Sequence, residues 1–97
     1  MTKAYWIAHV SVSDPQAYDK YRAANAVPFA RFGAKVLVRG GTQTVVEGQL
    51  RLRSVVIEFP SLQAATECYN SPDYKAAKAL RLGAGEADIC IIEGYDG

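Results

Sequence analysis

The hydrophobic pattern changes period abruptly at Pro60-Ser61, and this change constrains the fold more than any other feature of the chain. The preceding run, Ser54 to Phe59, is rich in β-branched and aromatic residues, which is typical of a buried strand. Pro60 suits the end of that strand because it has no amide for a sheet ladder. Ser61 then caps a helix, and Ser71-Pro72 repeats the signal of a cap followed by proline. The segment predicts one strand followed by two helical pieces.

The N-terminal part of the chain predicts a strand and a bent helix. Tyr5 to Val12 (YWIAHVSV) lacks glycine and proline, as a well-buried strand does. Asp14-Pro15 supplies a capping side chain and a residue suited to the first helical position. Pro28 has no amide to donate, so the helix either ends just before it or bends into a further turn that ends at Gly33. We favour the bend.

Two glycines interrupt the next strand-like stretch. Ala34 to Arg39 predicts a second strand, and Gly40-Gly41 separates it from further strand-like residues, Thr42 to Glu47. The glycines make either a tight hairpin turn or a bulge that bends one long strand. We favour the bulge, because Glu47-Gly48-Gln49 already offers a turn. Simple alternation along the second strand puts these residues on its two sides: Lys35, Leu37 and Arg39 against Val36 and Val38.

The last strand completes a recognisable order of elements. Asp88 to Tyr95 (DICIIEGY) has the composition of a strand, so the order is β, α, β, β, α, β. This order predicts an α+β, ferredoxin-like sandwich with a four-stranded antiparallel sheet and helices on one face. With 97 residues, of which 49% are hydrophobic, the chain suits a single domain over residues 1–97.

Both faces of the predicted sheet are apolar. Helices cover only one face of such a sheet, and the other should be polar if the domain works alone. A second copy of the chain is the simplest cover, with two sheets packed into a shared barrel. We therefore predict a homodimer formed through the sheet face. The first strand shows the pattern, with Trp6, Ala8, Val10 and Val12 on one side and Tyr5, Ile7, His9 and Ser11 on the other.

Several stretches together resemble a known family. They are YWIAHVSVSDPQAYDKY, VRGG followed by VVEG, VVIEFPS with AATECYNSPDYKAAKALR, and the closing IIEGYDG. The chain resembles the domain-of-unknown-function family 1330, within the dimeric α+β barrel superfamily. The resemblance implies a ferredoxin-like homodimer and brings no established reaction. The wider superfamily includes cofactor-free monooxygenases, haem-degrading enzymes and small-ligand binders, so the fold alone does not select a function.

The charge balance argues against nucleic-acid partners. Eleven basic and ten acidic residues give a formal net charge of +1, which produces no long-range field. Arg39, Arg51 and Arg53 form at most a local patch, and we interpret them as solvated surface because Glu47 lies among them and no aromatic residue is interleaved. No run approaches the roughly 18 apolar residues that cross a membrane. We expect neither nucleic acid nor membrane as a partner.

The cysteines and carboxylates do not suggest a metal or cofactor. Cys68 and Cys90 belong to no CxxC pair, and we interpret both as buried small hydrophobes, although spacing alone leaves a disulfide open. The chain begins directly in a strand without a signal-like leader, so we expect a reducing cytoplasm. No metal-ligand spacing, phosphate loop, GxSxG or GxGxxG occurs.

His9 and Glu58 are the candidate catalytic residues. His9, the only histidine, lies in the middle of the first strand, and Glu58 has matching parity on the third. We expect the third strand to run parallel beside the first, which makes the two residues neighbours. A carboxylate beside an imidazole fixes its tautomer, as a general base or proton shuttle requires. The simpler interpretation is a hydrogen-bonded pair at a dimer interface.

Two further groups are candidates for ligand binding. Arg39 offers a planar fork for an anion, and the amides of Gly40 and Gly41 could help to hold it; the simpler interpretation is a bulge with a solvated arginine. Aromatic residues at helical spacing are usually core, but they could also line a pocket between the helices and the sheet. The aromatic candidates are Tyr18, Tyr21, Tyr69 and Tyr74, together with Trp6.

The last helix has an apolar stripe and a basic end. We expect Tyr74, Ala77 and Leu80 on its inner face, because they follow each other at three-residue spacing. Arg81 follows directly, and we consider a charge pair with Glu93 at the end of the last strand.

Three classes of function are compatible with these residues. The first is a small-molecule enzyme, such as a cofactor-independent oxygenase or isomerase, in which His9 and Glu58 handle a proton and tyrosines cover the substrate. The second is a non-catalytic structural or stress-related dimer. The third is a haem-binding protein with His9 as axial ligand. No motif in the chain names a reaction.

Overall fold

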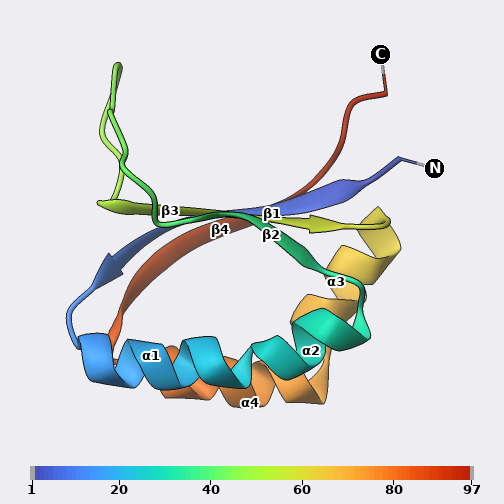
Figure 1. Cartoon of the computed structure of the whole chain (residues 1–97), viewed down its shortest axis with the longest axis horizontal. Helices are drawn as coiled ribbons and strands as arrows, with labels where there is room; N and C mark the ends of the chain where they lie inside the picture. The colour runs from blue at the N-terminus through green and yellow to red at the C-terminus, as the bar shows by residue number, and fades with distance from the viewer. Residues whose placement is uncertain (1, 97) are drawn as a thin grey trace.

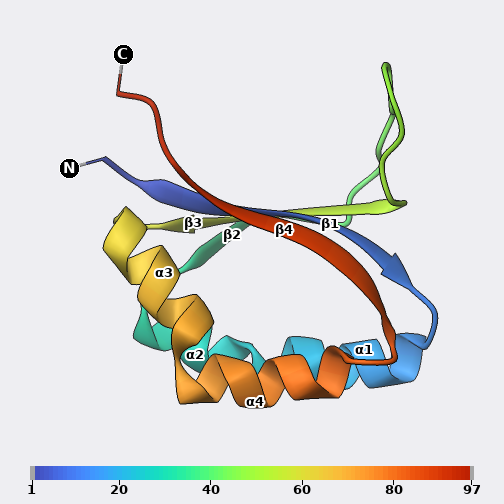
Figure 2. The ribbon, with the colours of Figure 1, turned by 180° about the vertical axis from the view of Figure 1, so that it is seen from behind.

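The computed structural model describes residues 2–96 and has the predicted α+β, ferredoxin-like architecture. The four strands form one antiparallel sheet in the order β2-β3-β1-β4, and all four helices lie on one side of it (Figure 1). Figure 2 shows the same two layers from behind, with α4 below β4. The elements are β1 (Ala4–Val12), α1 (Pro15–Ala24), α2 (Ala26–Arg31), β2 (Lys35–Arg39), β3 (Arg53–Phe59), α3 (Leu62–Asn70), α4 (Pro72–Arg81) and β4 (Gly85–Glu93).

Side-chain caps start three of the helices where the sequence predicts them. Asp14 accepts a hydrogen bond from the amide of Ala17 at 3.2 Å, at the start of α1. Ser61 accepts from Ala64 at 3.0 Å at the start of α3. Ser71 does the same for Tyr74 at 3.2 Å, at the start of α4. Each cap satisfies an amide that has no partner within its helix.

The predicted bend before Pro28 is confirmed. α1 ends at Ala24, Asn25 lies between the two helices, and α2 carries the chain on to Arg31. Pro28 lies in the first turn of α2, where a missing amide costs little. Gly33 then adopts a φ of +74°, which turns the chain toward β2.

Trp6 lies at the centre of the core between the two layers. Its ring centroid is 4.9 Å from that of Tyr74 and 5.0 Å from that of Phe59, and further contacts join it to Phe29 and Tyr69. Its indole N–H donates to the carbonyl of Ala65 at 3.0 Å, so the only polar atom of this buried side chain is satisfied. The aromatic cluster therefore fastens the helices to the inner sheet face.

The outer sheet face carries apolar side chains that no helix of residues 2–96 covers (Figure 1). Ile7 and Val56 are half-buried, and Ile92 is 49% exposed. The segment 40–52 rises from the sheet on this side, away from the helices (Figure 1). The apolarity of both faces agrees with the strand parity of the sequence.

The predicted bulge at Gly40-Gly41 is wrong. Segment 40–52 contains no strand, and Gly40, with a φ of +65°, turns the chain out of the sheet. The register shift lies inside β2 instead: Val36 faces Ile57 and Val38 faces Val56, so Leu37 is the extra residue. This bulge reverses the alternation, and Arg39, opposite Val55, shares the inner face with Val36.

The expected parallel pairing of the first and third strands is also wrong. β1 and β3 are antiparallel, with His9 opposite Ser54 and Tyr5 opposite Glu58. The reason is the connection: β3 turns back from β2 through segment 40–52, so it runs opposite to both β2 and β1. His9 and Glu58 share a face but lie four positions apart along it, or about 13 Å at the usual rise of a strand.

Candidate functional site

A hollow opens between the inner sheet face and helices α1 and α4. It encloses about 550 Å³ of space between atoms, including the solvent at its mouth. The side chains of Tyr18 and Tyr21 form its helix wall. The cavity itself is small, about 40 Å³, because its walls lie close together. Its apolar walls are Trp6, Ala8, Val10, Tyr18, Tyr21, Phe29, Val36, Val55, Ile57, Ala87 and Ile89.

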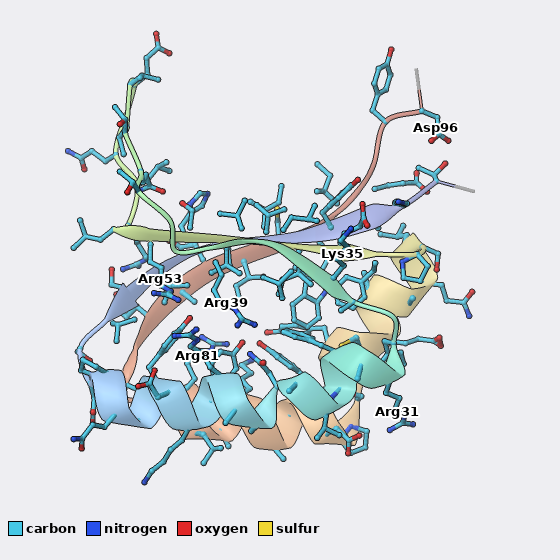
Figure 3. All side chains as sticks on the ribbon, in the orientation of Figure 1. Arg31, Lys35, Arg39, Arg53, Arg81 and Asp96 are labelled. Carbon is cyan, nitrogen blue, oxygen red and sulfur yellow. The ribbon has the colours of Figure 1, made fainter. Side chains whose placement is uncertain are left out.

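Four arginines enter this hollow from four different elements. Figure 3 shows Arg39 and Arg53 reaching down from the sheet and Arg81 reaching up from α4 toward the same space. Arg22 of α1 also lines it and is paired with Asp19 at 3.7 Å. No aspartate or glutamate in residues 2–96 lines the hollow. The site is therefore positively charged although the chain as a whole is nearly neutral.

Arg81 is the most deeply enclosed of these arginines and was missed as a site residue. It is 7% exposed, and its guanidinium carbon lies 5.3 Å from the ring centroid of Tyr21. Its Nε is enclosed and has no hydrogen-bond partner within residues 2–96. Arg81 shares the inner face of α4 with Tyr74 and Ala77, whereas Leu80 is 44% exposed. The predicted inward orientation of Leu80 is thus wrong. The seven-residue spacing between Tyr74 and Arg81 could have indicated that Arg81 lies on the inner face.

The predicted charge pair between Arg81 and Glu93 does not form. Arg81 ends α4 inside the hollow, whereas Glu93 pairs with Ala4 at the other end of β4. The two residues are separated by nearly the whole length of that strand.

Arg53 lies beside Gly40, and this contact depends on the missing side chain of glycine. Its guanidinium carbon is 5.5 Å from the ring centroid of Tyr18, and its Nε also lacks a partner in the described chain. A Cβ on Gly40 would lie 2.6 Å from that guanidinium carbon. The amide of Gly40 donates to the carbonyl of Ser54 at 2.9 Å and is therefore already engaged, and a role of Gly40 in holding an anion stays a prediction. A Cβ on Gly41 would meet nothing within 4 Å.

Arg39 lies at the mouth of the hollow, where it is exposed. Strict alternation puts it on the face opposite Val36, and only the bulge at Leu37 turns it inward. The three arginines interpreted as solvated surface therefore have different surroundings: Arg39 and Arg53 line the hollow, Arg51 does not, and the Nε of Arg53 is enclosed.

Two of the four candidate tyrosines line the hollow. Burial raises the pKa of Tyr18, with a contribution from Tyr21, and the nearby guanidinium groups only partly oppose this. Tyr18 is therefore a neutral phenol that can donate a hydrogen bond at neutral pH. Tyr21 shares a hydrogen bond of 2.8 Å with the hydroxyl of Tyr74. Tyr74, fully buried, and Tyr69 belong to the aromatic core and do not line the hollow.

His9 lies on the outer sheet face, away from the hollow. Its Nδ1 is 3.0 Å from Oγ of Ser54, and that hydroxyl donates to Oε1 of Gln43. Gln43 is itself oriented, because its Nε2 donates to the carbonyl of Arg51 at 2.9 Å. His9, Ser54 and Gln43 therefore form one hydrogen-bonded chain on the outer face.

Glu58 has partners other than His9. Nζ of Lys3 lies 3.4 Å from its Oε1, and the hydroxyl of Tyr5 donates to the same atom at 3.4 Å. The expected neighbourhood of His9 and Glu58 is therefore wrong, and a catalytic role for either stays a prediction.

The donor atoms of the described residues do not favour a metal or haem centre. No group of three or more histidine, cysteine, aspartate or glutamate residues in 2–96 is placed to hold a metal ion. No histidine, cysteine or methionine of this range lines the hollow, and His9 is on the other side of the sheet, so haem in the hollow would have no axial histidine. Both cysteines are free: Cys68 is buried as predicted, and Cys90 is exposed, contrary to prediction.

Within residues 2–96, no helix has both the length and the apolar character required to cross a membrane.

The two layers and the hollow between them define a ferredoxin-like α+β protein with an arginine-lined pocket. The chain belongs to the family described as Domain of unknown function (DUF1330), whose model matches residues 3–95. The resemblance drawn from its motifs is confirmed. No protein with a curated description matches the sequence significantly.

Solved structures share the fold at low sequence identity. The RPA0582 protein of unknown function from Rhodopseudomonas palustris has a TM-score of 0.77 at 19% identity, covering 99% of this chain and 85% of that one. SnoaB, a cofactor-independent oxygenase from Streptomyces nogalater, has a TM-score of 0.65 at 12% identity. The match covers 100% of this chain and 97% of SnoaB. A dimeric protein of unknown function from Bacteroides fragilis has a TM-score of 0.63 at 14% identity. The match covers 94% of this chain and 95% of that protein. At these identities the likeness concerns the fold alone.

Proposed function

We propose that this protein is a homodimer that binds a small molecule in the hollow between its helices and its sheet. The observation that supports this most directly is the pair of enclosed, unpartnered Nε atoms of Arg53 and Arg81. A buried donor without a partner costs about 1 to 3 kcal/mol, more when it is charged, so proteins rarely keep one without a use. A ligand that accepts these hydrogen bonds would remove the cost.

The homodimer rests on the outer sheet face. Its half-buried Ile7 and Val56 and its exposed Ile92 continue an apolar surface that one chain leaves uncovered. The Bacteroides fragilis protein of the same fold is described as dimeric. Packing two such faces together would leave each hollow accessible, because the hollows lie on the helix side.

Ligand binding is tested by a co-structure together with a thermal-shift screen of small acids, amides, amines and neutral aromatics. We expect at least one class to raise the melting temperature and its density to lie among Tyr18, Arg53 and Arg81. A ligand found only on the outer face, or no stabilising compound in any class, contradicts the proposed pocket.

Oxygenase or isomerase chemistry without a cofactor is the second candidate. A positively charged hollow with a phenol donor, Tyr18, suits the stabilisation of an enolate or phenolate, on which such chemistry depends. SnoaB, which shares the fold, is described as a cofactor-independent oxygenase. No histidine or carboxylate of residues 2–96 lines the hollow, and burial keeps Tyr18 protonated, so the substrate itself would have to supply the base.

A proton-handling role of His9 belongs to the outer face and is tested separately. His9→Ala should leave the fold intact and abolish turnover if His9 is the base for a substrate held there. A stability loss of about 1 to 3 kcal/mol without any effect on activity indicates the structural role, in which the histidine only satisfies Ser54. The non-catalytic, structural or stress-related dimer would then be favoured.

A cytoplasmic location is part of the same proposal. Cys68 and Cys90 are both free, and they lie on opposite sides of the sheet, one buried and one exposed. A reducing compartment keeps such an exposed thiol unpaired.

A further inference from the structure

We infer that the ligand of the hollow is a small carboxylate with a flat apolar body, its carboxylate held by the guanidinium groups of Arg53 and Arg81. The inference rests on the proposed function and specifies the chemical class of the ligand.

The charge of the site selects an anion. Four guanidinium groups line the hollow, and no carboxylate in the described chain lines it to neutralise them. Arg22 has Asp19 nearby, but no ion pair within residues 2–96 involves Arg39, Arg53 or Arg81. The formal charge of the whole chain is only +1, so this excess is local. Buried charges are normally paired, and the missing partner here is an anion.

The enclosed donors select where that anion sits. Arg81 is 93% buried, and its unpartnered Nε and that of Arg53 are shielded from solvent. Tyr18 and Tyr21 support the two guanidinium groups at 5.5 and 5.3 Å from their ring centroids. A planar guanidinium matches a planar carboxylate through two parallel hydrogen bonds. The carboxylate subsite therefore lies between Arg53 and Arg81, and Arg39, which is exposed, adds a further guanidinium group to the hollow.

The remaining walls select an apolar body. Val10, Val36, Val55 and Ile89 line the sheet side, and Phe29 lies on the helix side. The free space is narrow, which favours a flat group that slides between sheet and tyrosines. A phosphate dianion carries a stronger hydration shell than a carboxylate and gains less from apolar walls. A carboxylate on a small aromatic or alicyclic ring fits both the guanidinium pair and the apolar walls of the site.

The test compares each acid with its own amide. Acetate, benzoate and 2-naphthoate are titrated into the dimeric protein beside acetamide, benzamide and 2-naphthamide, with phenyl phosphate as a further anion. Binding is followed by calorimetry and by amide shifts in NMR, which detect millimolar affinities. We expect benzoate or naphthoate to bind at least about tenfold more tightly than its amide, with weaker binding in high salt.

Variants locate the binding. Arg81→Met and Arg53→Met should each weaken the benzoate or naphthoate affinity at least about tenfold. Arg31→Met is the matched control, because Arg31 is exposed, pairs with Asp73 at 3.0 Å and lies outside the hollow. The affinity of Arg31→Met for benzoate or naphthoate should stay within about twofold of the wild-type affinity. Melting curves show that each variant is folded, and neither hollow variant should melt below the control.

Each outcome decides between defined alternatives. An amide that binds as tightly as its acid overturns the carboxylate inference and leaves the proposed pocket standing. Tighter binding of phenyl phosphate than of every carboxylate also overturns it. If Arg31→Met loses as much affinity for the acid as Arg53→Met and Arg81→Met do, the effect comes from the general charge of the chain, and the proposed site is rejected. If no acid and no amide binds with a Kd below about 10 mM, which corresponds to a binding free energy of about −2.7 kcal/mol, the inference and the proposed pocket both fail.

Discussion

Arg81 is a charged side chain in a place that favours apolar ones. It occupies the inner face of α4, is 7% exposed, and has its guanidinium over the ring of Tyr21. Cation–π contact returns part of the cost of burying a guanidinium, but a carboxylate partner is missing among the residues that line the hollow. Without ligand, this residue therefore costs the fold stability.

Replacing that charge should stabilise the unliganded protein. We predict that Arg81→Met raises the free energy of unfolding by about 1 kcal/mol, because a similar apolar volume replaces an unpaired charge. Urea denaturation at neutral pH measures it, and Arg31→Met should change the value by less than about 0.5 kcal/mol. A loss of more than about 1 kcal/mol in Arg81→Met would show that the guanidinium is structural.

Cys68 should make the protein sensitive to high pH. Burial raises the pKa of its thiol from 9.0 to about 12. The unfolded chain therefore loses this proton first, the folded state binds more protons between pH 9 and about 12, and stability falls as the pH rises through this range. From pH 8 to 10.5 the loss through this thiol is about 2 kcal/mol.

Paired variants isolate the contribution of this thiol. Between pH 8 and 10.5 the free energy of unfolding of Cys68→Ala should fall by about 2 kcal/mol less than that of the wild type, as denaturation at both pH values measures. Cys90→Ala, at the exposed cysteine, should behave like the wild type. Parallel losses in wild type and Cys68→Ala would contradict the assignment.

At the level of the elements, the end of β2 organises the site. The bulge at Leu37 turns Arg39 inward, and Gly40 turns the chain out of the sheet while leaving room for Arg53. Neither feature follows from composition, since VLVRGG has the residues of an ordinary strand followed by a glycine turn. The bulge is a property of the pairing with β3, and pairing depends on a partner strand that starts at Arg53.

Gly40 and Gly41 should respond differently to a side chain. We predict that Gly40→Ala destabilises the protein by about 1 to 2 kcal/mol, because its φ of +65° disfavours alanine and the new Cβ displaces the guanidinium of Arg53. Gly41→Ala, with open space around it, should stay within about 0.5 kcal/mol of the wild type. Thermal melts measure both, and equal effects would argue against a specific contact with Arg53.

At the level of the whole molecule, the two sheet faces have different partners. Helices and the aromatic core around Trp6 cover the inner face, and the outer face keeps its apolar side chains exposed. A chain of 97 residues buries a thin core, so covering this second face with another copy would contribute substantially to stability.

Light scattering should find a dimer at micromolar concentration. A charge on the outer face, Ile92→Lys, should shift the protein to a monomer, because a lysine in the sheet interface must be desolvated. Leu80→Lys is the control: Leu80 is similarly exposed, 44% against 49%, but it lies on α4 in the helix layer. Wild-type protein that scatters as a monomer, or equal behaviour of the two variants, would reject the proposed interface.

The sequence by itself determined the elements, their order and the apolarity of both sheet faces. Caps at Asp14, Ser61 and Ser71 and the alternation in β1 depend on residues close together in the chain, so local chemistry was sufficient to read them. The change of period at Pro60 is confirmed as the end of β3 and the start of α3.

Only the tertiary structure decided where the site lies. The antiparallel pairing of β1 with β3 separated His9 from Glu58, and the bulge in β2 brought Arg39 to the inner face. The convergence of Arg53 and Arg81 depends on long-range packing, which places α4 and β3 around one hollow. A one-residue shift in register exchanges the two faces of a strand, and no local pattern reports such a shift. For this reason the sequence identified the layers, and the folded chain identified the hollow between them.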